Sequence, residues 1–396
     1  MDKQEFIKEY AVKRTNTDSV KWDGLADKFG RADLMALWVA DTEFKIPKQA
    51  QKALIKRIEH GAFGYSLTPK DYYEAYFTWQ KKRYGIELHK DWLRFGTGVV
   101  QSLSTCVQFM TKPGESVLVL QPVYHPFMNV IENNERHLVI SELKNTAGYY
   151  EMDFSDIEAK IIDQNVKLLI LCSPHNPVGR VWSQEELTTL FEICTKHQVL
   201  VIADEIHHDL IIAKDKPFVS ALSVADGLYR DNLVVLDAPS KTFNMAALDF
   251  SHVIIPNPQL QMRYDALVNR LSAPAGNILG KIAAKEAYTH GAEWLECMLV
   301  VILDNYVYLK DNLSAYSSKI NVTKLEGTYL AWVDLSQVVK PDDLERFIID
   351  EAKLAVNFGE MFGQSGKGYI RINLATTPEN IKQAVTSLIN ALKTLG

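Results

Sequence analysis

The stretch VVLDAPSKTFN, at residues 234–244, places a lysine directly after a short apolar run that ends at Pro239. The run predicts a buried strand, and the small polar residues that follow predict a loop at its end. Lysine is almost never buried unless it is paired or used, and desolvation lowers its pKa and makes it a nucleophile. Lys241 therefore suits a Schiff base with an aldehyde, although this stretch alone is equally compatible with a surface lysine after a strand.

Short apolar segments alternate with helical patterns on both sides of this stretch, from residue 115 to residue 255. The capping-box pattern Ser183-x-x-Glu186 marks the start of one of the helices. Such alternation predicts a mostly parallel sheet covered by helices on both faces. We expect strands at 116–120, within 133–143, and at 166–172, 199–203 and 233–236, and helices at 154–162 and 183–197.

Four polar residues follow the apolar runs of this region, namely Tyr124, Asn176, Asp204 and Lys241. In open α/β sheets, ligands bind at the carboxyl ends of the strands. We therefore expect these four side chains to lie along one edge of the sheet. Two prolines flank Asn176 and hold its backbone in a restricted conformation, which fits either a rigid turn or a site.

The segment DEIHHD, at residues 204–209, offers two interpretations. His and carboxylate side chains are ligands for zinc or manganese. Alternatively, Asp204 is a buried carboxylate that pairs with a pyridinium nitrogen. The spacing favours the second interpretation, because adjacent residues of an extended segment point apart and cannot converge on one ion. His208 and Asp209 are then expected to be polar surface residues or the start of a helix.

The segment GTGVV, at residues 96–100, leads into a helical pattern. Exposed backbone N–H groups at the start of a helix bind anions, usually phosphate. A plain turn is the competing interpretation, because the segment lacks the full dinucleotide-binding fingerprint. The later segment GQSGKG, at residues 363–368, lacks the ending of a P-loop and predicts an ordinary loop.

The remaining segments suggest a second, smaller α/β unit at the C-terminus, joined by the N-terminal residues. The chain of 396 residues is too long for one core. The predicted organisation is an N-terminal segment (1–46), a large domain (47–290) and a small domain (291–396). Residues 34–41 are expected to form a strand or an extended arm, and 61–66 a loop. Helices are expected at 47–57, 71–84, 278–288, 293–313, 341–351 and 378–395, and strands at 329–335 and 369–374.

Composition excludes several classes of protein. The net charge of −6 argues against a general nucleic-acid or anionic-membrane surface. The first residues show no apolar signal region, and no apolar run approaches the ~20 residues of a membrane helix. Four cysteines without a CxxC pair argue against metal fingers and disulfide frameworks. We therefore expect a cytoplasmic protein.

Taken together, the motifs resemble the fold-type I pyridoxal phosphate enzymes of the class I/II aminotransferase superfamily. Within it the chain is similar to the MalY/PatB-type C–S lyases, or cystathionine β-lyases, from about Trp38 to Leu374. The resemblance implies an aspartate aminotransferase-like fold, in which a mostly parallel seven-stranded sheet binds pyridoxal 5'-phosphate beside a smaller α/β domain. It rests on WVAD (38–41), GYS (64–66), GVV (98–100), PVYHPF (122–127), SPHNPVGRVW (173–182), DEIHHDL (204–210), SKTFN (240–244), GNILG (276–280), EGTYLAW (326–332) and GKGYIRINL (366–374).

The resemblance also implies roles for single residues. Lys241 and Tyr124 are the expected catalytic residues: the lysine carries the cofactor covalently, and the tyrosine stacks on its ring. Asp204 pairs with the ring nitrogen, while Asn176 and His207 contact the phenolic oxygen. The phosphate is held by Val99, Val100 and Ser240.

Further implications concern the substrate and a second subunit. Arg371 is expected to clamp the carboxylate of an amino-acid substrate in a bidentate fork, with Asn176 and Ala40 beside it. Tyr65 is expected to reach the phosphate in the neighbouring active site of a homodimer. No metal, nucleic-acid or membrane partner is expected.

Three functions remain open at this stage. A β-lyase acting on cystathionine, cysteine or related S-substituted cysteines is favoured, because His207 stands where many related aminotransferases have tyrosine. An aminotransferase of the same fold is the enzymatic alternative. A regulatory protein that binds a transcription activator is the alternative of another class. The segments 42–43, 245–247 and 272–275 depart from the family pattern and leave the exact substrate open.

Overall fold

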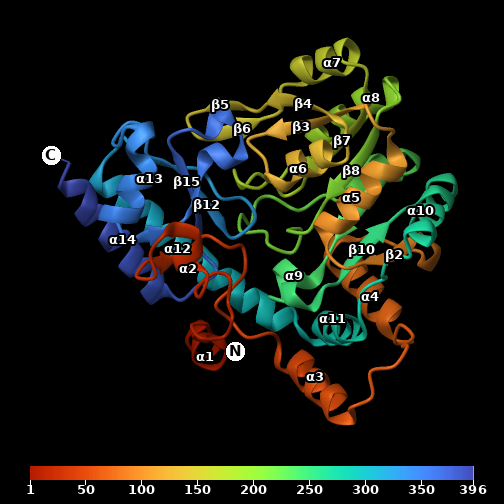
Figure 1. Cartoon of the computed structure of the whole chain (residues 1–396), viewed down its shortest axis with the longest axis horizontal. Coiled ribbons are helices and arrows are strands. Elements are labelled where there is room, and N and C mark those ends of the chain that lie inside the picture. Colours follow the sequence, from red (N-terminus) through yellow and green to blue (C-terminus); the bar gives the residue numbers. More distant parts are fainter. Residues whose placement is uncertain (396) are drawn as a thin grey trace.

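The computed structural model describes residues 1–395, and its centre is a seven-stranded sheet (Figure 1). Strands β9 to β4 run parallel to one another, whereas β10 is antiparallel to both of its neighbours. The predicted mostly parallel sheet is therefore confirmed. In spatial order its strands are β2 (Leu93–Gly96), β10 (Ser251–Ile254), β9 (Leu233–Asp237), β8 (Leu200–Asp204), β7 (Val166–Cys172), β3 (Ser116–Gln121) and β4 (His137–Glu142).

Both faces of this sheet are apolar, as the continuous hydrophobic runs predict. In β3, Val117 and Val119 belong to one buried cluster, whereas Leu118 and Leu120 belong to another on the opposite face. The first cluster includes side chains of α5 (Val99–Met110), α6 (Pro126–Asn133) and α10 (Pro258–Leu271). The second includes side chains of α7 (Phe154–Asp163) and α8 (Gln184–Lys196). The predicted capping box opens α8, because Ser183 and Glu186 cap each other's backbone N–H groups.

A second, antiparallel sheet lies in the C-terminal part of the chain. Its order is β11 (Asn321–Val322), β12 (Leu330–Asp334), β15 (Tyr369–Asn373) and β14 (Asn357–Phe358). The long helix α12 (Ala292–Tyr316) packs against α14 (Pro378–Lys393) beside this sheet (Figure 1). The helix expected over 341–351 is instead a 3₁₀ turn, one α-helical turn (α13, Leu344–Arg346) and a π turn.

The N-terminal segment contacts both sheets. It contains α1 (Lys3–Tyr10), α2 (Leu25–Phe29) and the two-residue strand β1 (Met35–Ala36), which pairs with β13 (Leu354–Ala355). Of the strand or arm expected over 34–41, therefore, only two residues pair as a strand. Residues 39–44 are held by side-chain amides: Asn373 donates to the carbonyl groups of Val39 and Asp41, and Asn244 donates to those of Thr42 and Phe44. The domain boundaries given above remain a prediction.

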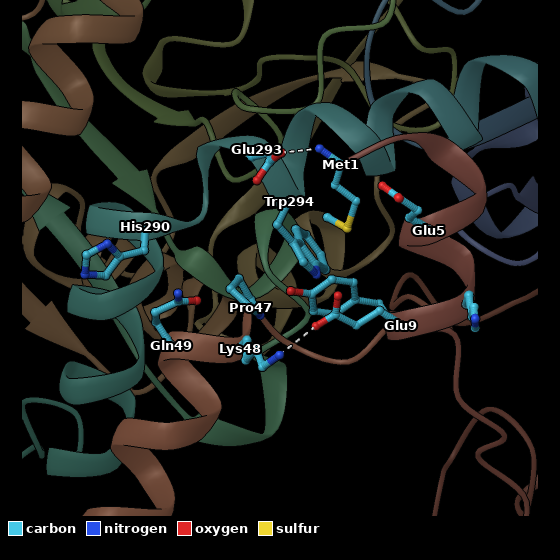
Figure 2. Close-up of a pocket in the computed structure, with 11 residues that line it drawn as sticks. Met1, Glu5, Glu9, Pro47, Lys48, Gln49, His290, Glu293 and Trp294 are labelled. Atoms are coloured by element: carbon cyan, nitrogen blue, oxygen red, sulfur yellow. Dashed lines mark hydrogen bonds and ion pairs between the residues drawn. The ribbon is translucent and has the colours of Figure 1, made fainter.

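Helix α1 is fixed to the start of α12, beside a hollow of about 600 Å³ (Figure 2). The amino group of Met1 pairs with Glu293, and Lys48 pairs with Glu9 at 3.2 Å. Phe6 packs edge-on against Trp294. This hollow shares no lining residue with the cavity described below.

Helix α3 (Lys48–His60) and the loop after it project at the bottom of the view in Figure 1, before the chain returns in α4 (Tyr72–Tyr84). Helix α3 packs on α11 (Ile278–His290), but it exposes Ile55 and Ile58. A small hairpin, β5 (Lys144–Thr146) and β6 (Tyr149–Glu151), completes the described strands. Across residues 1–395, no helix is both long and apolar enough to span a bilayer.

Candidate active site

Parallel strand ends bring the predicted site residues to one cavity of about 220 Å³. Cys172, the last residue of β7, pairs in register with Asp204, the last residue of β8, and Asp204 lies opposite Leu236 of β9. The loops that leave these strands therefore start at one edge of the sheet. The predicted residues that line the cavity are Ala40, Val99, Val100, Tyr124, Asn176, Asp204, His207, Ser240 and Lys241.

Lys241 lies in the short helix α9 (Pro239–Thr242), and its Nζ donates a hydrogen bond to the carbonyl oxygen of Ala40 at 2.7 Å. Burial lowers the pKa of Lys241 to about 8; Asp41 raises the pKa, Arg371 lowers it and Asp204 raises it. An amine with this pKa is partly neutral near neutral pH. The interpretation of Lys241 as a surface residue is therefore wrong, and the side chain is suited to act as a nucleophile or a base.

Asp204 is a buried carboxylate with few partners. Its Oδ1 accepts a hydrogen bond from the backbone N–H of Ile206 at 3.1 Å. Burial raises the pKa of Asp204 to about 7, against the lowering effects of the Ile206 N–H and of Lys241. A carboxylate in this situation gains most from a cation placed in the cavity beside it.

The start of α5 also lines the cavity. The amides of Val99, Val100 and Gln101 precede the first hydrogen bond within the helix, which runs from Ser102 N–H to Gly98 O at 2.9 Å. The first turn of α5 carries no acidic residue. These amides and the positive end of the helix dipole form a site for an anion such as phosphate.

Arg371 borders the cavity through Asn176, whose Oδ1 accepts a hydrogen bond from Nη1 at 3.1 Å. Its Nη2 donates to Trp38 O at 3.1 Å and to Asn357 Oδ1 at 2.6 Å. Burial lowers the pKa of Arg371 to about 10. Within residues 1–395, no carboxylate forms a salt bridge with this guanidinium. A buried cation held by neutral acceptors is suited to receive the carboxylate of a ligand.

His207 and Tyr124 also line the cavity. Burial lowers the pKa of His207 well below its usual value, and the charges of Lys241 and Arg371 lower it further. The imidazole is therefore neutral at neutral pH, and its buried Nδ1 has no hydrogen-bond partner among the described residues. Burial raises the pKa of Tyr124, so its hydroxyl stays protonated.

The structure separates His208 and Asp209 from this cavity, and the expectation that they lie on the surface is wrong. Both are buried. Asp209 accepts hydrogen bonds from Trp79 Nε1 at 3.0 Å and from Thr242 Oγ1 at 2.9 Å. Through Thr242, Asp209 therefore contacts α9, the helix that carries Lys241. Among the described residues, no group of three or more His, Cys, Asp or Glu side chains is arranged to hold a metal ion.

Tyr65 lies outside the cavity. It is fully exposed on the loop after α3, so the single chain does not test its predicted contact with a neighbouring site. Sequence reasoning gave no role to Tyr329, whose hydroxyl donates to the same Ala40 oxygen at 2.9 Å. Tyr329 lay within a quoted motif, but no local pattern indicated that it meets residue 40 in space.

Comparisons with known proteins match nearly the whole chain. The family model for class I and II aminotransferases matches residues 32–388. Cystathionine beta-lyase PatB of Bacillus subtilis is 36% identical over 95% of this chain and 98% of its own length. The PLP-bound C–S lyase from Staphylococcus hominis superposes with a TM-score of 0.90 at 34% identity, covering 96% of both chains.

A PLP-bound putative aminotransferase from Clostridium difficile superposes with a TM-score of 0.93 at 36% identity, covering 97% of this chain and 99% of its own. The matched region contains the whole cavity and both sheets. The chain therefore belongs to the class I and II aminotransferase family.

Proposed function

We propose that this protein is a pyridoxal phosphate-dependent C–S lyase that carries out β-elimination on S-substituted cysteines. The substrate is L-cystathionine, L-cysteine or a related thioether, and the products are a thiol or sulfide, pyruvate and ammonia. The arrangement of three groups in one cavity carries the cofactor part of the proposal: the low-pKa amine of Lys241, the buried carboxylate of Asp204 and the free amides of α5. The similarity to cystathionine beta-lyase PatB and to the C–S lyase from Staphylococcus hominis supports the lyase part.

The residues fit the cofactor at each of its functional groups. The α5 amides with Ser240 would hold the phosphate, and Asp204 would hold the ring nitrogen in its protonated form. Asn176 and His207 would donate to the phenolic oxygen, and Tyr124 would pack on the ring. The buried Nδ1 of His207 and the raised pKa of Asp204 support this fit, because both groups lack a sufficient partner within the chain.

When bound, the cofactor would supply an electron-accepting ring that draws electron density away from the substrate's Cα. Arg371 holds the substrate carboxylate and so orients the Cα–H bond toward Lys241. Lys241 Nζ, once free, takes the Cα proton as a general base. The thiolate then leaves with little acid assistance, because an ordinary thiol has a pKa of about 8.5.

The deciding experiment is a pyruvate assay on the purified, cofactor-loaded protein with cystathionine and no keto acid. We expect catalytic pyruvate in equal amounts with a free thiol. If pyruvate is absent with cystathionine, cysteine and other thioethers, and amino groups move only after a keto acid is added, the protein is an aminotransferase. Cofactor-dependent capture of a transcription activator without turnover would instead support the regulatory alternative.

Arg371→Lys is expected to lower kcat/KM by about 10- to 100-fold, mainly through KM, because an ammonium cannot reproduce the two parallel hydrogen bonds of a planar guanidinium to a carboxylate. Steady-state kinetics of pyruvate release would measure this. Arg94→Lys is the matched control, because Arg94 donates two hydrogen bonds to the carboxylate of Asp265 outside the cavity. Equal effects of the two substitutions would contradict the role of Arg371.

We also propose a homodimer, in which the projecting loop reaches the neighbouring active site. The support is a group of exposed apolar side chains along α3 and this loop, at Ile55, Ile58, Phe63, Tyr65 and Leu67. Large exposed apolar patches mark contact surfaces. A cytoplasmic location is proposed as well, since all four cysteines are free and buried.

Tyr65→Phe is expected to weaken cofactor binding by about 10- to 100-fold, because one hydrogen bond to a charged phosphate is lost. The dimer is expected to remain associated. Sedimentation would give the oligomeric state, and titration of cofactor absorbance would give the affinity. Tyr316→Phe serves as a control at an exposed site on α12. The prediction fails if the protein is a monomer, or if the affinity of Tyr65→Phe equals that of the control.

A further inference from the structure

Two side chains from distant parts of the chain share one backbone acceptor that lines the cavity. The carbonyl oxygen of Ala40 accepts from Lys241 Nζ at 2.7 Å and from the hydroxyl of Tyr329 at 2.9 Å. Lys241 follows β9 of the large sheet, whereas Tyr329 immediately precedes β12 of the small sheet. Because a carbonyl oxygen offers two lone pairs, these two donors use its full capacity.

The shared carbonyl group is fixed by its neighbours in the chain. Asn373 Nδ2 donates to Val39 O at 2.6 Å and to Asp41 O at 2.7 Å, on either side of Ala40. Thr42 N–H donates to Asn244 Oδ1 at 3.1 Å. The peptide group of Ala40 therefore cannot turn to follow one donor, and the two donors compete for it at a fixed position.

Tyr329 is a permanent competitor for this oxygen. The residue is completely buried, and its ring packs edge-on against His207 with 5.8 Å between the ring centres. Burial raises the pKa of Tyr329 well above the usual value, so the phenol remains a donor throughout the working pH range. The two donors occupy the two lone pairs of one oxygen, and each draws electron density from the acceptor that the other uses.

We propose that Tyr329 is a positioning residue that acts through the Ala40 carbonyl to set the basicity and the resting place of the Lys241 amine. The phenol reduces the power of this carbonyl to stabilise the ammonium form, and so keeps more of the lysine neutral. The role in turnover rests on the proposed function, in which the freed amine removes the Cα proton. The effect on the lysine itself does not depend on that function.

The other charged groups around Lys241 come from three further elements and stay in place when Tyr329 is changed. They are Asp41 in the N-terminal segment, Asp204 of β8 and Arg371 of β15, with the neutral His207 beside them. In Tyr329→Phe the carbonyl keeps a single donor and binds the ammonium more strongly. We expect the pKa of Lys241 to rise by about half a unit to one unit.

The test compares Tyr329→Phe with Tyr306→Phe. Tyr306 is also buried and donates to a backbone carbonyl, but to that of Thr323 at 3.0 Å rather than to that of Ala40. The first readout is the pH dependence of Lys241 acetylation by trace acetic anhydride in the full chain without cofactor, measured by peptide mass spectrometry. The second is the acidic limb of the pH profile of kcat for pyruvate release from the cofactor-loaded enzyme.

A raised pKa in Tyr329→Phe alone supports the proposal. An unchanged or lowered pKa, or an equal shift in both variants, overturns it. If Tyr329→Phe does not fold, a fluorinated tyrosine introduced at position 329 keeps the shape and strengthens the donor. The pKa of Lys241 is then expected to fall, and an unchanged value overturns the proposal. Acetylation could show the expected change in the pKa of Lys241 while no variant releases pyruvate. That result would refute the lyase function and leave the inference about Tyr329 intact.

Discussion

Lys241→Ala is expected to remove the visible absorption band of the lysine-linked cofactor and to lower turnover by about 10⁴-fold or more. A general base contributes about 10²- to 10⁴-fold by itself, and the covalent attachment of the cofactor is lost as well. Absorbance of the loaded protein and pyruvate release are the two measurements. Both losses are expected because the substitution removes the amine of Lys241, whose pKa is lowered by burial in the cavity.

Two controls separate this outcome from misfolding. Lys160→Ala removes a lysine of α7 that pairs with Asp156 at 2.7 Å, outside the cavity, and should leave turnover unchanged. A small primary amine added to Lys241→Ala should restore part of the activity by replacing the missing base. Full activity of Lys241→Ala without added amine would disprove the assignment of this lysine.

Asp204→Asn is expected to reduce turnover of the loaded enzyme by about 10²- to 10³-fold. The neutral amide cannot keep a proton on a ring nitrogen, so the electron-accepting power of the cofactor falls. Pyruvate kinetics at saturating cofactor would show the loss in kcat. Asp156→Asn, at a carboxylate of α7, is the control outside the cavity. Retention of more than a third of the activity by Asp204→Asn would contradict the pairing.

The same substitution should stabilise the protein when no cofactor is bound. The pKa of Asp204 is about 7 in the folded chain against about 3.8 in an unfolded one, so the folded state holds the extra proton between these values. Stability is then lost as the pH rises through this window and stays low above it, by an amount on the order of a few kcal/mol. Thermal unfolding at pH 8 should therefore give a higher Tm for Asp204→Asn than for the natural chain.

The sequence was most informative where local pattern and function coincide. The apolar runs before Asp204 and Lys241 predicted parallel strands, and the ends of such strands meet at one edge. The placement of Asn176 followed from the same reasoning, whereas the α5 amides were predicted from the glycine-containing segment that opens a helix. These predictions hold because each residue is fixed by the strand or helix to which it is attached.

The features that sequence reasoning missed depend on contacts between distant segments. The sequence predicted that His208 and Asp209 lie on the surface. In the structure α4 covers them, and Trp79 of that helix donates a hydrogen bond to Asp209. Tyr329 meets Ala40 because the side chains of Asn373 and Asn244 hold residues 39–44 in place. No short-range pattern reports a contact between residues 40 and 329.

The two hydrogen bonds from Asn373 to the carbonyl groups of residues 39 and 41 also constrain when the protein can become active during its synthesis. Residue 40 leaves the ribosome early, but its carbonyl group is fixed only after Asn373 has emerged and β15 has paired with β12. A nascent chain that already displays the complete seven-stranded sheet would still lack the fixed acceptor for its lysine. The fixed acceptor for Lys241 therefore forms only after β15 has been synthesised and has paired with β12.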